Sequence, residues 1–572
     1  MNHALLVSVL LFSVVGLAQQ PEQSAPVPAA DVFQDVSTDH HHLVTTKSAE
    51  AQRAFDQGLQ LIYAFNYGEA ENFFRRAAAL DPNMAMAYWG MAYAMGTSYY
   101  MPANAVREED AQDAIQHALA LSANGSEVER AYIQTLAKRY SPALALSANG
   151  PDFESIHVEA LAKPPNSCPY PNRQRQAAEF RNAMRALTQS YPDDLDAATL
   201  YAHSIMNMNP GRLWNADGTP REGTAEIVAV LESVLKRDPR HIGAVHYYIH
   251  AVEGSPNPER ALAFANTLPS LAPTIGHLVH MPAHIYLRTG DYSGAEDASA
   301  KAAQVDEHYI RNSSAPDVFT VMSYIHNLYF ISTAASMSGH FSAAKEAADK
   351  LVALIGPHLN EMPHLEAFLI VPATVLVRFN RWDDILKLPQ PVERLKIANT
   401  VWHFARGMAF AATGKLMEAE AEHQAVTKAL DSTPFEEVFA MPPNNKTREI
   451  LLIAVDVLAA KLAMARNERS LAIAQLRDAV AVQDALKYGE PPSWFYPVRE
   501  SLGAAIFLDG NISEAEKLFR EDLQRNPSNP RSLFGLQQAL KARGRAYEAG
   551  LVQHELSIAW KSDVQLLNLS NF

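Results

Sequence analysis

Histidines crowd the middle of this sequence. Of its 21 histidines, nine lie between His203 and His326, and the two segments HYYIHAVE and GHLVHMPAHIY contain five of these. Neutral imidazole nitrogens bind first-row transition metals at about 2 Å. The pairs His246/His250 and His280/His284 are spaced i,i+4, so each pair presents two such nitrogens on one face of a helix. The spacing predicts a divalent transition-metal site.

The same histidines share a helix face across several expected helix pairs. In each pair one small or medium residue packs against the partner helix: Ala202, Ile249, Ala283 or Ser332. His203, His250 and His284 follow that residue by one position, His246 and His280 precede it by three, His277 and His326 precede it by six, and Glu253 follows it by four. At about 100° per residue, these offsets fall within an arc of about 80°. We therefore expect their side chains to converge.

The predicted ligand set follows from this arc. It comprises His246, His250, Glu253, His277, His280 and His284, with His203, His326, Tyr248 and Tyr286 as further ligands or outer partners. A set that includes the Glu253 carboxylate suits zinc, iron or manganese, whereas an all-imidazole set suits copper or nickel equally well. The expected cofactor is a divalent transition metal such as Zn, Cu or Fe, and several ring nitrogens should lie within about 4–5 Å of a common point.

Two other interpretations of the histidines stay open. They could form a structural polar network with tyrosine partners, namely Tyr247, Tyr248, Tyr286 and Tyr324, or a metal-free site for an acidic ligand. Pro282 also allows two readings, because it either kinks a helix between His280 and His284 or begins a shortened helix.

A repeated helix-pair pattern must position these residues. From Ala51 to Pro82, Gly58 marks a helix crossing, Asn66 a turn and Phe74 an apolar stripe; the layout returns from Tyr496 to Pro527 with Gly503, Gly510-Asn511 and Phe519. Gly58 and Ala92 are 34 residues apart, as are Ile249 and Ala283. This pattern resembles the tetratricopeptide repeat (TPR), whose period is about 34 residues. The resemblance implies an all-α superhelical solenoid of antiparallel helix pairs, in which the first helices line a concave groove.

The chain divides into six expected segments. Residues 1–18 resemble a secretory signal with cleavage after Ala18, which predicts export to a periplasm or the medium. Residues 19–47 form a flexible leader in which Asp39-His40-His41-His42 is expected to be exposed, or else to fold as an arm over the groove. Residues 48–140 carry the N-terminal TPR-like helices, 141–172 an insertion loop, 173–355 the central histidine-rich helices and 356–572 the C-terminal helices.

Composition excludes several classes of partner and cofactor. The formal net charge of −15 argues against a nucleic-acid ligand, which needs a basic surface. No integral membrane segment is expected in the mature chain, and the single cysteine, Cys168, cannot form an internal disulfide. No phosphate-binding glycine loop, nucleophile elbow or H-E-x-x-H pattern occurs, so no nucleotide cofactor is expected.

The repeat segments together with HYYIHAVEGSPNPERA and GHLVHMPAHIYLRTGDY resemble a group of exported bacterial TPR proteins with a histidine-rich central segment. That resemblance implies the fold and export but no reaction. We predict an exported TPR-like scaffold whose histidine-lined groove binds a transition-metal ion. The alternatives are a metal-dependent hydrolase or oxidase using that groove, and a metal-free scaffold that holds a protein or peptide in it; catalysis stays open.

Overall fold

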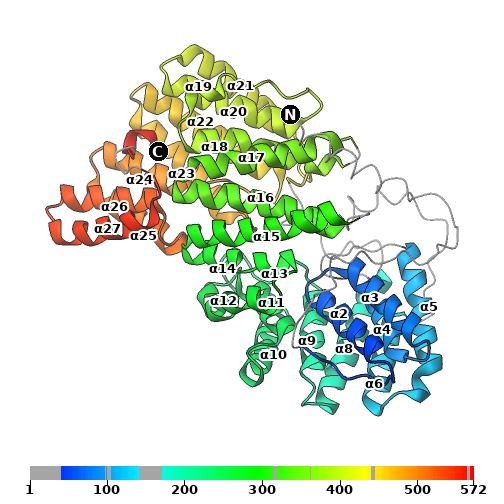
Figure 1. The fold of residues 1–572 in the computed structure, drawn as a ribbon. Coiled ribbons are helices and arrows are strands. Elements are labelled where there is room, and N and C mark those ends of the chain that lie inside the picture. Colours follow the sequence, from blue (N-terminus) through cyan, green and yellow to red (C-terminus); the bar gives the residue numbers. More distant parts are fainter. Residues whose placement is uncertain are drawn as a thin grey trace. The chain divides into compact units, whose positions relative to one another are not determined.

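The computed structural model describes residues 40–96, 98, 105–140, 171–313, 318–360, 362–439, 445–562 and 567–572. In these residues the regular structure is helical, and β pairing is limited to two isolated bridges, Trp214–Pro220 and Val438–Lys446 (Figure 1). The all-α prediction is confirmed. The predicted signal peptide, most of the leader and residues 141–170 of the insertion loop lie outside the described residues.

Two compact units make up the chain. Unit 1 contains residues 1–282 and 301–324, and unit 2 contains residues 283–300 and 325–572, so the chain enters unit 2, returns to unit 1 and leaves it again. Among the described residues, no helix combines the length and the apolar character needed to cross a membrane.

The helices that lie entirely in unit 1 follow one another as antiparallel neighbours. They are α2 (Ala49–Tyr63), α3 (Tyr67–Leu80), α4 (Ala85–Met95), α5 (Ala105–Leu121), α6 (Glu127–Ala137), α8 (Pro171–Ser190), α9 (Leu195–Met206), α10 (Thr224–Arg237), α11 (Ile242–Val252), α12 (Leu262–Leu271) and α13 (Gly276–His280), with short 3-10 turns at Ser122–Asn124, Lys138–Tyr140 and Pro258–Ala261.

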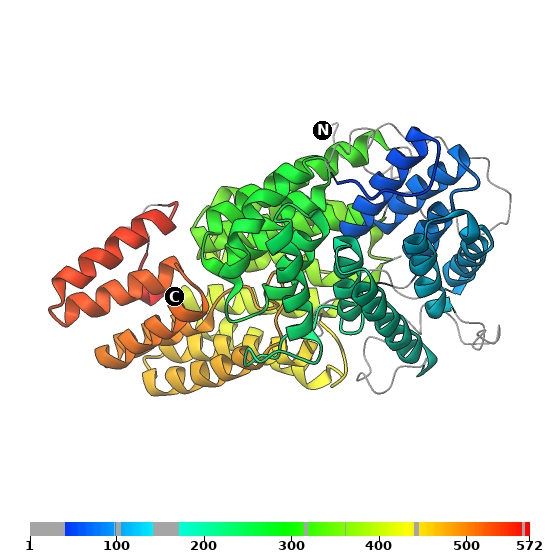
Figure 2. The same cartoon turned by 90° about the horizontal axis from the view of Figure 1, so that it is seen from below.

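Three further helices adjoin or cross the unit boundary in sequence: α14 (Pro282–Thr289), α15 (Tyr292–Asn312) and α16 (Val318–Ser338). Unit 2 continues with α17 (Phe341–Ile355), α18 (Val371–Arg378), α19 (Trp382–Ile385), α20 (Lys396–Ala412), α21 (Leu416–Ser432), α22 (Thr447–Ala465), α23 (Arg469–Ala485), α24 (Val498–Leu508), α25 (Ile512–Arg525), α26 (Pro530–Ala542) and α27 (Ala546–Ala559). The 3-10 turns Gly356–His358, Pro363–Ile370 (η9) and Leu569–Asn571 (η11) complete it. The last helices of unit 2, drawn in orange to red, stack in chain order (Figure 2).

Glycines allow the close helix crossings that the repeat pattern predicts. A Cβ placed on Gly58 would meet the Phe74 ring at 2.7 Å, and one on Gly503 would meet the Phe519 ring at 2.7 Å. Both aromatic rings are fully buried. Each pair therefore closes because an absent side chain makes room for a phenylalanine on the second helix.

Eight helix pairs turn through a residue with a positive φ. Glycine or asparagine occupies this position in seven pairs, at Gly290, Gly339, Asn380, Gly414, Asn467, Gly510 and Gly544, and Phe65 occupies it between α2 and α3 with φ 60°. Bulky residues rarely adopt this conformation, because their Cβ crowds the backbone at a cost of about 1–2 kcal/mol. Phe65 is thus the exception among the pair turns.

Pro282 begins a short helix, which is the second of its two predicted roles. It is the first residue of α14, whereas His277 and His280 lie on α13, which ends before it. One long helix over His277–His284 does not form. Proline fits a first helical position because it has no N–H to donate.

Candidate metal centre

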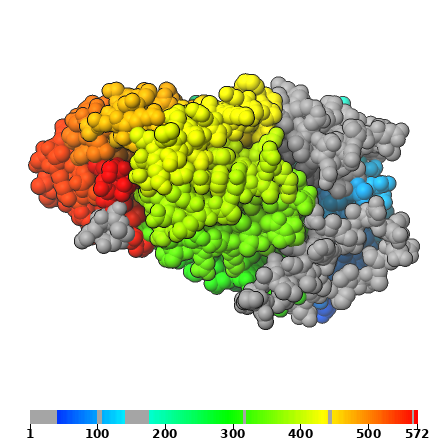
Figure 3. Space-filling model, turned by 90° about the horizontal axis from the view of Figure 1, so that it is seen from above, coloured from blue at the N-terminus to red at the C-terminus, as the bar shows by residue number. Residues whose placement is uncertain are grey.

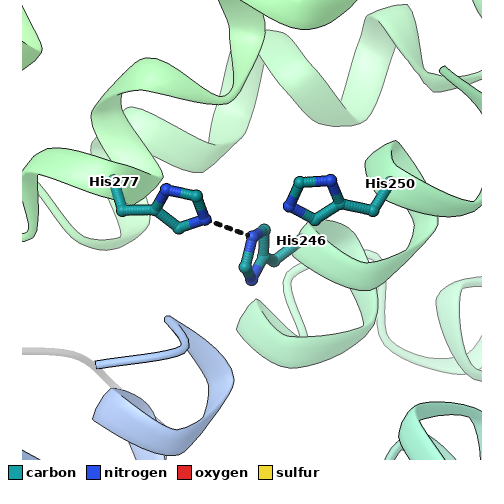
Figure 4. Close-up of side chains that lie close together, drawn as sticks. All are labelled: His246, His250 and His277. Atoms are coloured by element: carbon teal, nitrogen blue, oxygen red, sulfur yellow. Dashed lines mark hydrogen bonds between the residues drawn. The ribbon is translucent and has the colours of Figure 1, made fainter. Parts of the chain in front are cut away.

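Three of the predicted histidines come together inside unit 1. His246 and His250 lie on α11 and His277 lies on α13, and one ring nitrogen of each lies within 4.8 Å of the other two (Figure 4). The Nε2 atoms of His246 and His277 are 3.0 Å apart. All three residues are buried. The predicted convergence therefore holds for this triplet, which we call the histidine cluster.

Hydrogen bonds fix which nitrogen each α11 histidine presents. The Nδ1–H of His246 donates to the backbone carbonyl of Tyr63 at 2.5 Å, and the Nδ1–H of His250 donates to Glu253 Oε1 at 3.2 Å. A carbonyl and a carboxylate can only accept, so both protons lie on Nδ1 and both lone pairs lie on Nε2. A metal-binding histidine characteristically has such a partner on its other nitrogen.

Spacing in the cluster suits a small coordination sphere. Ligands at about 2.0–2.1 Å from a tetrahedral ion are separated by about 3.3–3.4 Å. The 3.0 Å contact between His246 and His277 is close to that separation, and it also accommodates a hydrogen bond from the His277 Nε2–H to the His246 lone pair. The arrangement can therefore exchange one imidazole proton for an ion.

Phe65 forms an aromatic wall against all three imidazoles. Its ring centroid lies 4.7 Å from that of His246, 5.6 Å from that of His250 and 6.1 Å from that of His277. Phe319 contacts His277 edge-on from another side, at 5.5 Å. This ring contact explains why a phenylalanine occupies the strained turn position after α2, since the turn aims its side chain at the cluster.

A hollow in unit 1 reaches one member of the cluster. His277 lines it together with Asp306, Tyr309, Phe319 and Ser323. Gly276 lets Asp306 approach, because a Cβ there would lie 1.8 Å from the Asp306 carboxylate, which also accepts a hydrogen bond from Ser323 at 2.9 Å. His277 is thus the cluster residue that borders the hollow, whose volume of about 10 Å³ has room for no more than about one water molecule.

Two predicted outer partners contact other groups. Tyr248 donates to Glu232 at 2.7 Å instead of joining the cluster. The physical reason is helical geometry, because Tyr248 is two residues from both His246 and His250 and so lies about 200° around α11 from each.

His203 belongs to a separate hydrogen-bonded core. Its Nδ1 lies 2.8 Å from the Tyr93 hydroxyl and its Nε2 lies 3.2 Å from the Tyr67 hydroxyl. Burial, with a smaller contribution from Arg139, lowers the pKa of His203 to about 3, so the ring is neutral. Both nitrogens of His203 thus have tyrosine partners, and its ring stacks on Tyr247, whose ring also packs against Phe65. The role of His203 as a ligand or outer partner stays a prediction.

The other predicted residues are divided between the units. Glu253 supports His250 as described, and His280 is buried at the end of α13. In unit 2, His284 forms an ion pair with Glu490 and lies 5.8 Å from His326 between ring centroids, while Tyr286 packs on the Ala283–Ala295–Phe330 core. Convergence of His280 and His284 with the histidine cluster stays a prediction.

A second group of buried polar residues in unit 1 surrounds the Asp196 carboxylate. Of its members, only His40 and His42 had a predicted place, as part of the leader. Asp196 at the start of α9 is buried, and its carboxylate contacts His40 Nε2 at 3.0 Å, His42 Nδ1 at 2.7 Å and His241 Nε2 at 3.2 Å, as well as the Tyr63 hydroxyl. The interpretation of His40 and His42 as exposed leader residues is wrong, because the Asp196 carboxylate holds both imidazoles inside the unit.

The Asp196 group is a buried charge cluster. His241 Nδ1 accepts from the Ala244 N–H and caps α11, and its Nε2 lies 3.2 Å from the Asp196 carboxylate. Burial opposes the charge on His42, but hydrogen bonding and attraction to Asp196 raise its pKa to about 9. Burial likewise opposes the charge on Asp196, and the imidazoles of His40, His241 and His42 hold its pKa well below the usual range. The group therefore fastens the N-terminal arm by charge pairing.

The known proteins that match this chain are solved structures of low sequence identity. No protein-family model matches the chain, and no curated protein matches it. Among solved structures, the human IFIT1 dimer with m7Gppp-AAAA is 12% identical with a TM-score of 0.32, covering 88% of this chain and 95% of that chain. Yeast Tom70 is 13% identical with a TM-score of 0.28 over 90% and 94%, and the P58(IPK) TPR domain is 12% identical with a TM-score of 0.23 over 87% and 99%. These scores are too low to carry an argument, so the TPR-like description rests on the helix pairs, their glycine crossings and their turns.

Proposed function

We propose that this protein is a TPR-like scaffold that binds a divalent transition-metal ion through the Nε2 atoms of His246, His250 and His277. One observation carries the proposal: one ring nitrogen each of His246, His250 and His277 lies within 4.8 Å of the other two, and the Nε2 atoms of His246 and His277 are 3.0 Å apart. An ordinary core histidine needs only one partner for each nitrogen. Three buried imidazoles with converging nitrogens exceed that need.

The ligand chemistry favours borderline metals. Imidazole suits zinc, copper, nickel and iron, and the aromatic wall of Phe65 and Phe319 keeps the surroundings apolar. Binding through Nε2 requires the His277 proton to move from Nε2 to Nδ1 and any imidazolium to lose its extra proton, so affinity should rise with pH until all three imidazoles are neutral.

The test measures binding and stability together. Chelator-treated protein is titrated with Zn²⁺, Cu²⁺, Ni²⁺ and Fe²⁺ in turn, by calorimetry and by thermal unfolding. An ion at about 100 times its Kd should stabilise the folded chain by about 2.7 kcal/mol. His246→Ala and His250→Ala should each weaken binding by at least about 100-fold, because each removes one of three ligands.

His423→Ala is the matched control, since His423 is a partly buried helical histidine of unit 2 that lies outside the cluster. It should leave the metal-dependent shift unchanged. If no first-row ion shifts the melting temperature of the unmodified chain, the cluster is a structural polar network and the protein is a metal-free scaffold.

A metal-dependent enzyme is a second candidate, favoured by the hollow that His277 lines. Three protein ligands leave a tetrahedral ion with one position for water or substrate, the arrangement found in catalytic zinc sites. Adding azide to the Co²⁺-loaded protein tests this: a changed visible spectrum shows an exchangeable position. An unchanged spectrum indicates a closed, structural site.

Export is the remaining part of the proposal, supported by the apolar stretch from Ala4 to Leu17 and the small residues Gly16 and Ala18 around the expected cleavage point. N-terminal sequencing of protein from the native cell should read from Gln19. An intact Met1 on mature protein would contradict export by this route.

A further inference from the structure

The last described residues of unit 2 lie in a groove formed by its own helices. Leu569, Ser570 and Phe572 line the groove together with residues of α20, α22 and α24, including Met408, Lys461 and Ala505. We call Leu567–Phe572 the tail. In Figure 3 its red atoms lie between the orange and yellow helices.

All three helices are first members of their pairs, since α20 precedes α21, α22 precedes α23 and α24 precedes α25. Apart from Leu476 of α23, the residues of these repeats that line the groove from a helix belong to first helices. The tail lies there as a short 3-10 turn, η11, whose start is capped by the Asn568 side chain accepting from the Ser570 N–H.

Apolar tail side chains point inward and polar ones point outward. Leu567 is 8% exposed and Leu569 is 7% exposed, whereas Asn568, Ser570 and Asn571 are exposed. The Arg531 guanidinium stacks over the Phe572 ring at 5.2 Å, and the Phe534 ring lies 6.1 Å away. The apolar residues of the tail thus follow the pattern Leu-x-Leu-x-x-Phe, in which Leu569 and Phe572 line the groove and Leu567 is also buried.

The tail does not lie where it would shield the exposed helix face at the end of the repeat stack. A segment with that role would lie on the outer face of α27, the last helix, yet Tyr547, Leu551 and Ile558 there are 81%, 52% and 64% exposed. These three residues form an i, i+4, i+11 stripe that the tail leaves uncovered. Instead the tail buries its leucines where first helices meet, which is a ligand's position.

We propose that the groove of α20, α22 and α24 is a peptide-binding site for extended segments of the form Leu-x-Leu-x-x-Phe, and that the tail fills it as an intramolecular ligand. A partner carrying the same pattern binds when it displaces the tail. Since Lys461 and Arg531 border the groove, neutral or acidic partner segments bind in preference to basic ones. The proposal is independent of the metal site, which lies in unit 1.

The experiment uses the full chain and a fluorescent peptide with the sequence of residues 561–572. Leu569→Asp combined with Phe572→Asp should release the tail, so the peptide should bind this variant saturably. Unmodified protein should bind at least about tenfold more weakly, because a tethered ligand competes at millimolar effective concentration. Ala505→Phe, added to the tail variant, should abolish binding by filling the groove.

Asn571→Ala is the control, because Asn571 is exposed and does not line the groove; it should leave peptide binding as weak as in the unmodified chain. A peptide with Phe572 replaced by Lys should not bind the tail variant. If the tail variant keeps its helical circular dichroism but does not bind the peptide, the proposal is wrong.

A second measurement tests the proposal without the tail variant, in case that variant does not fold. A dye on Ser570→Cys in the otherwise unmodified chain (with Cys168→Ser) reports whether the tail is docked. Excess peptide should release the tail and change the dye emission, whereas the Lys-containing peptide should not. No change at millimolar peptide would show that the tail is a fixed structural element.

Discussion

The helix pairs α2/α3 and α24/α25 share the same crossing and cap but lie near different buried polar groups. In α2/α3 of unit 1, Phe74 fills the space beside Gly58 and Gly90; in α24/α25 of unit 2, Phe519 fills the space beside Gly503 and Gly535. Asn66 and Asn511 cap the second helix in the same way, each accepting from the N–H three residues on. The repeat therefore specifies the crossing and the cap in both units.

The polar groups beside these pairs differ in kind. Beside α24, Glu500 is fully buried and pairs with the guanidinium groups of Arg378 and Arg531. Beside α2, the buried groups are imidazoles: the histidine cluster and the Asp196 group. Guanidinium keeps its proton at any physiological pH, whereas imidazole can exchange its proton for a metal ion. Unit 2 thus buries a guanidinium–carboxylate network beside this pair, whereas unit 1 buries a group of imidazoles that could hold an ion and a carboxylate paired with imidazoles.

The largest effect should come from breaking the unit 2 charge network. Arg378→Met should destabilise unit 2 by about 3–5 kcal/mol, because Glu500 loses one of its two guanidinium partners in a site without water access. Hydrogen exchange resolved by peptide measures both units in one sample. Arg381→Met, at an exposed ion pair next along the chain, should cost no more than about 1 kcal/mol. A cost below about 1 kcal/mol for Arg378→Met would show that Arg531 alone satisfies Glu500.

Acid should act first on unit 1. The pKa of His203 is about 3 in the folded chain and 6.5 in its unperturbed state, so below pH 6.5 the unfolded chain takes up the proton and the folded chain does not. Stability from this group is therefore complete above about pH 6.5 and falls as the pH drops, by about 3 kcal/mol between pH 7 and pH 4. His203→Gln cannot titrate, and its unit 1 should lose less stability over that range. Equal pH profiles for the two proteins would contradict the neutral, buried ring.

Overpacking tests whether the two glycine crossings are equivalent. Gly503→Leu and Gly58→Leu should each cost about 1–3 kcal/mol, since even a Cβ would lie 2.7 Å from the facing phenylalanine ring in both cases. Urea unfolding followed by peptide-resolved exchange assigns each loss to its own unit. Gly550→Leu is a control, because a Cβ there meets no atom within 4 Å. A large difference between the two crossings would mean that one pair relaxes where the other does not.

The features that the sequence predicted correctly are those set by the repeat period of about 34 residues or by the helical period of about 3.6 residues. Gly58 and Phe74, like Gly503 and Phe519, are set by the repeat, and the His246/His250 pair is set by the helix. The contact between His246 and His277 was not predictable from the period alone, because the helix that carries His277 ends before Pro282. The Asp196 group was missed because its members come from the arm, α9 and α11, which only tertiary packing brings together. Tyr248 could have been excluded from its position on the helix wheel alone.

The smallest expected effect isolates the backbone cost of the pair turn. At Gly510, φ is 92° and an added Cβ would meet no atom within 4 Å, so Gly510→Ala changes only backbone conformational energy. We expect a loss of about 1 kcal/mol in unit 2, measured by urea unfolding.

The loss at Gly510 estimates the backbone conformational energy that a non-glycine residue, Phe65, adds to unit 1 at the matching turn, where φ is 60°. Phe65→Gly should recover about that amount of backbone energy while removing a fully buried ring, for a net loss of about 2–4 kcal/mol. If the ring's contacts with His246, His250 and His277 shape the metal site, Phe65→Gly should also weaken ion binding, whereas Gly510→Ala should leave it unchanged. If Phe65→Gly binds the ion with unchanged affinity, the Phe65 ring serves only in core packing. The metal site would then not account for a phenylalanine at this turn.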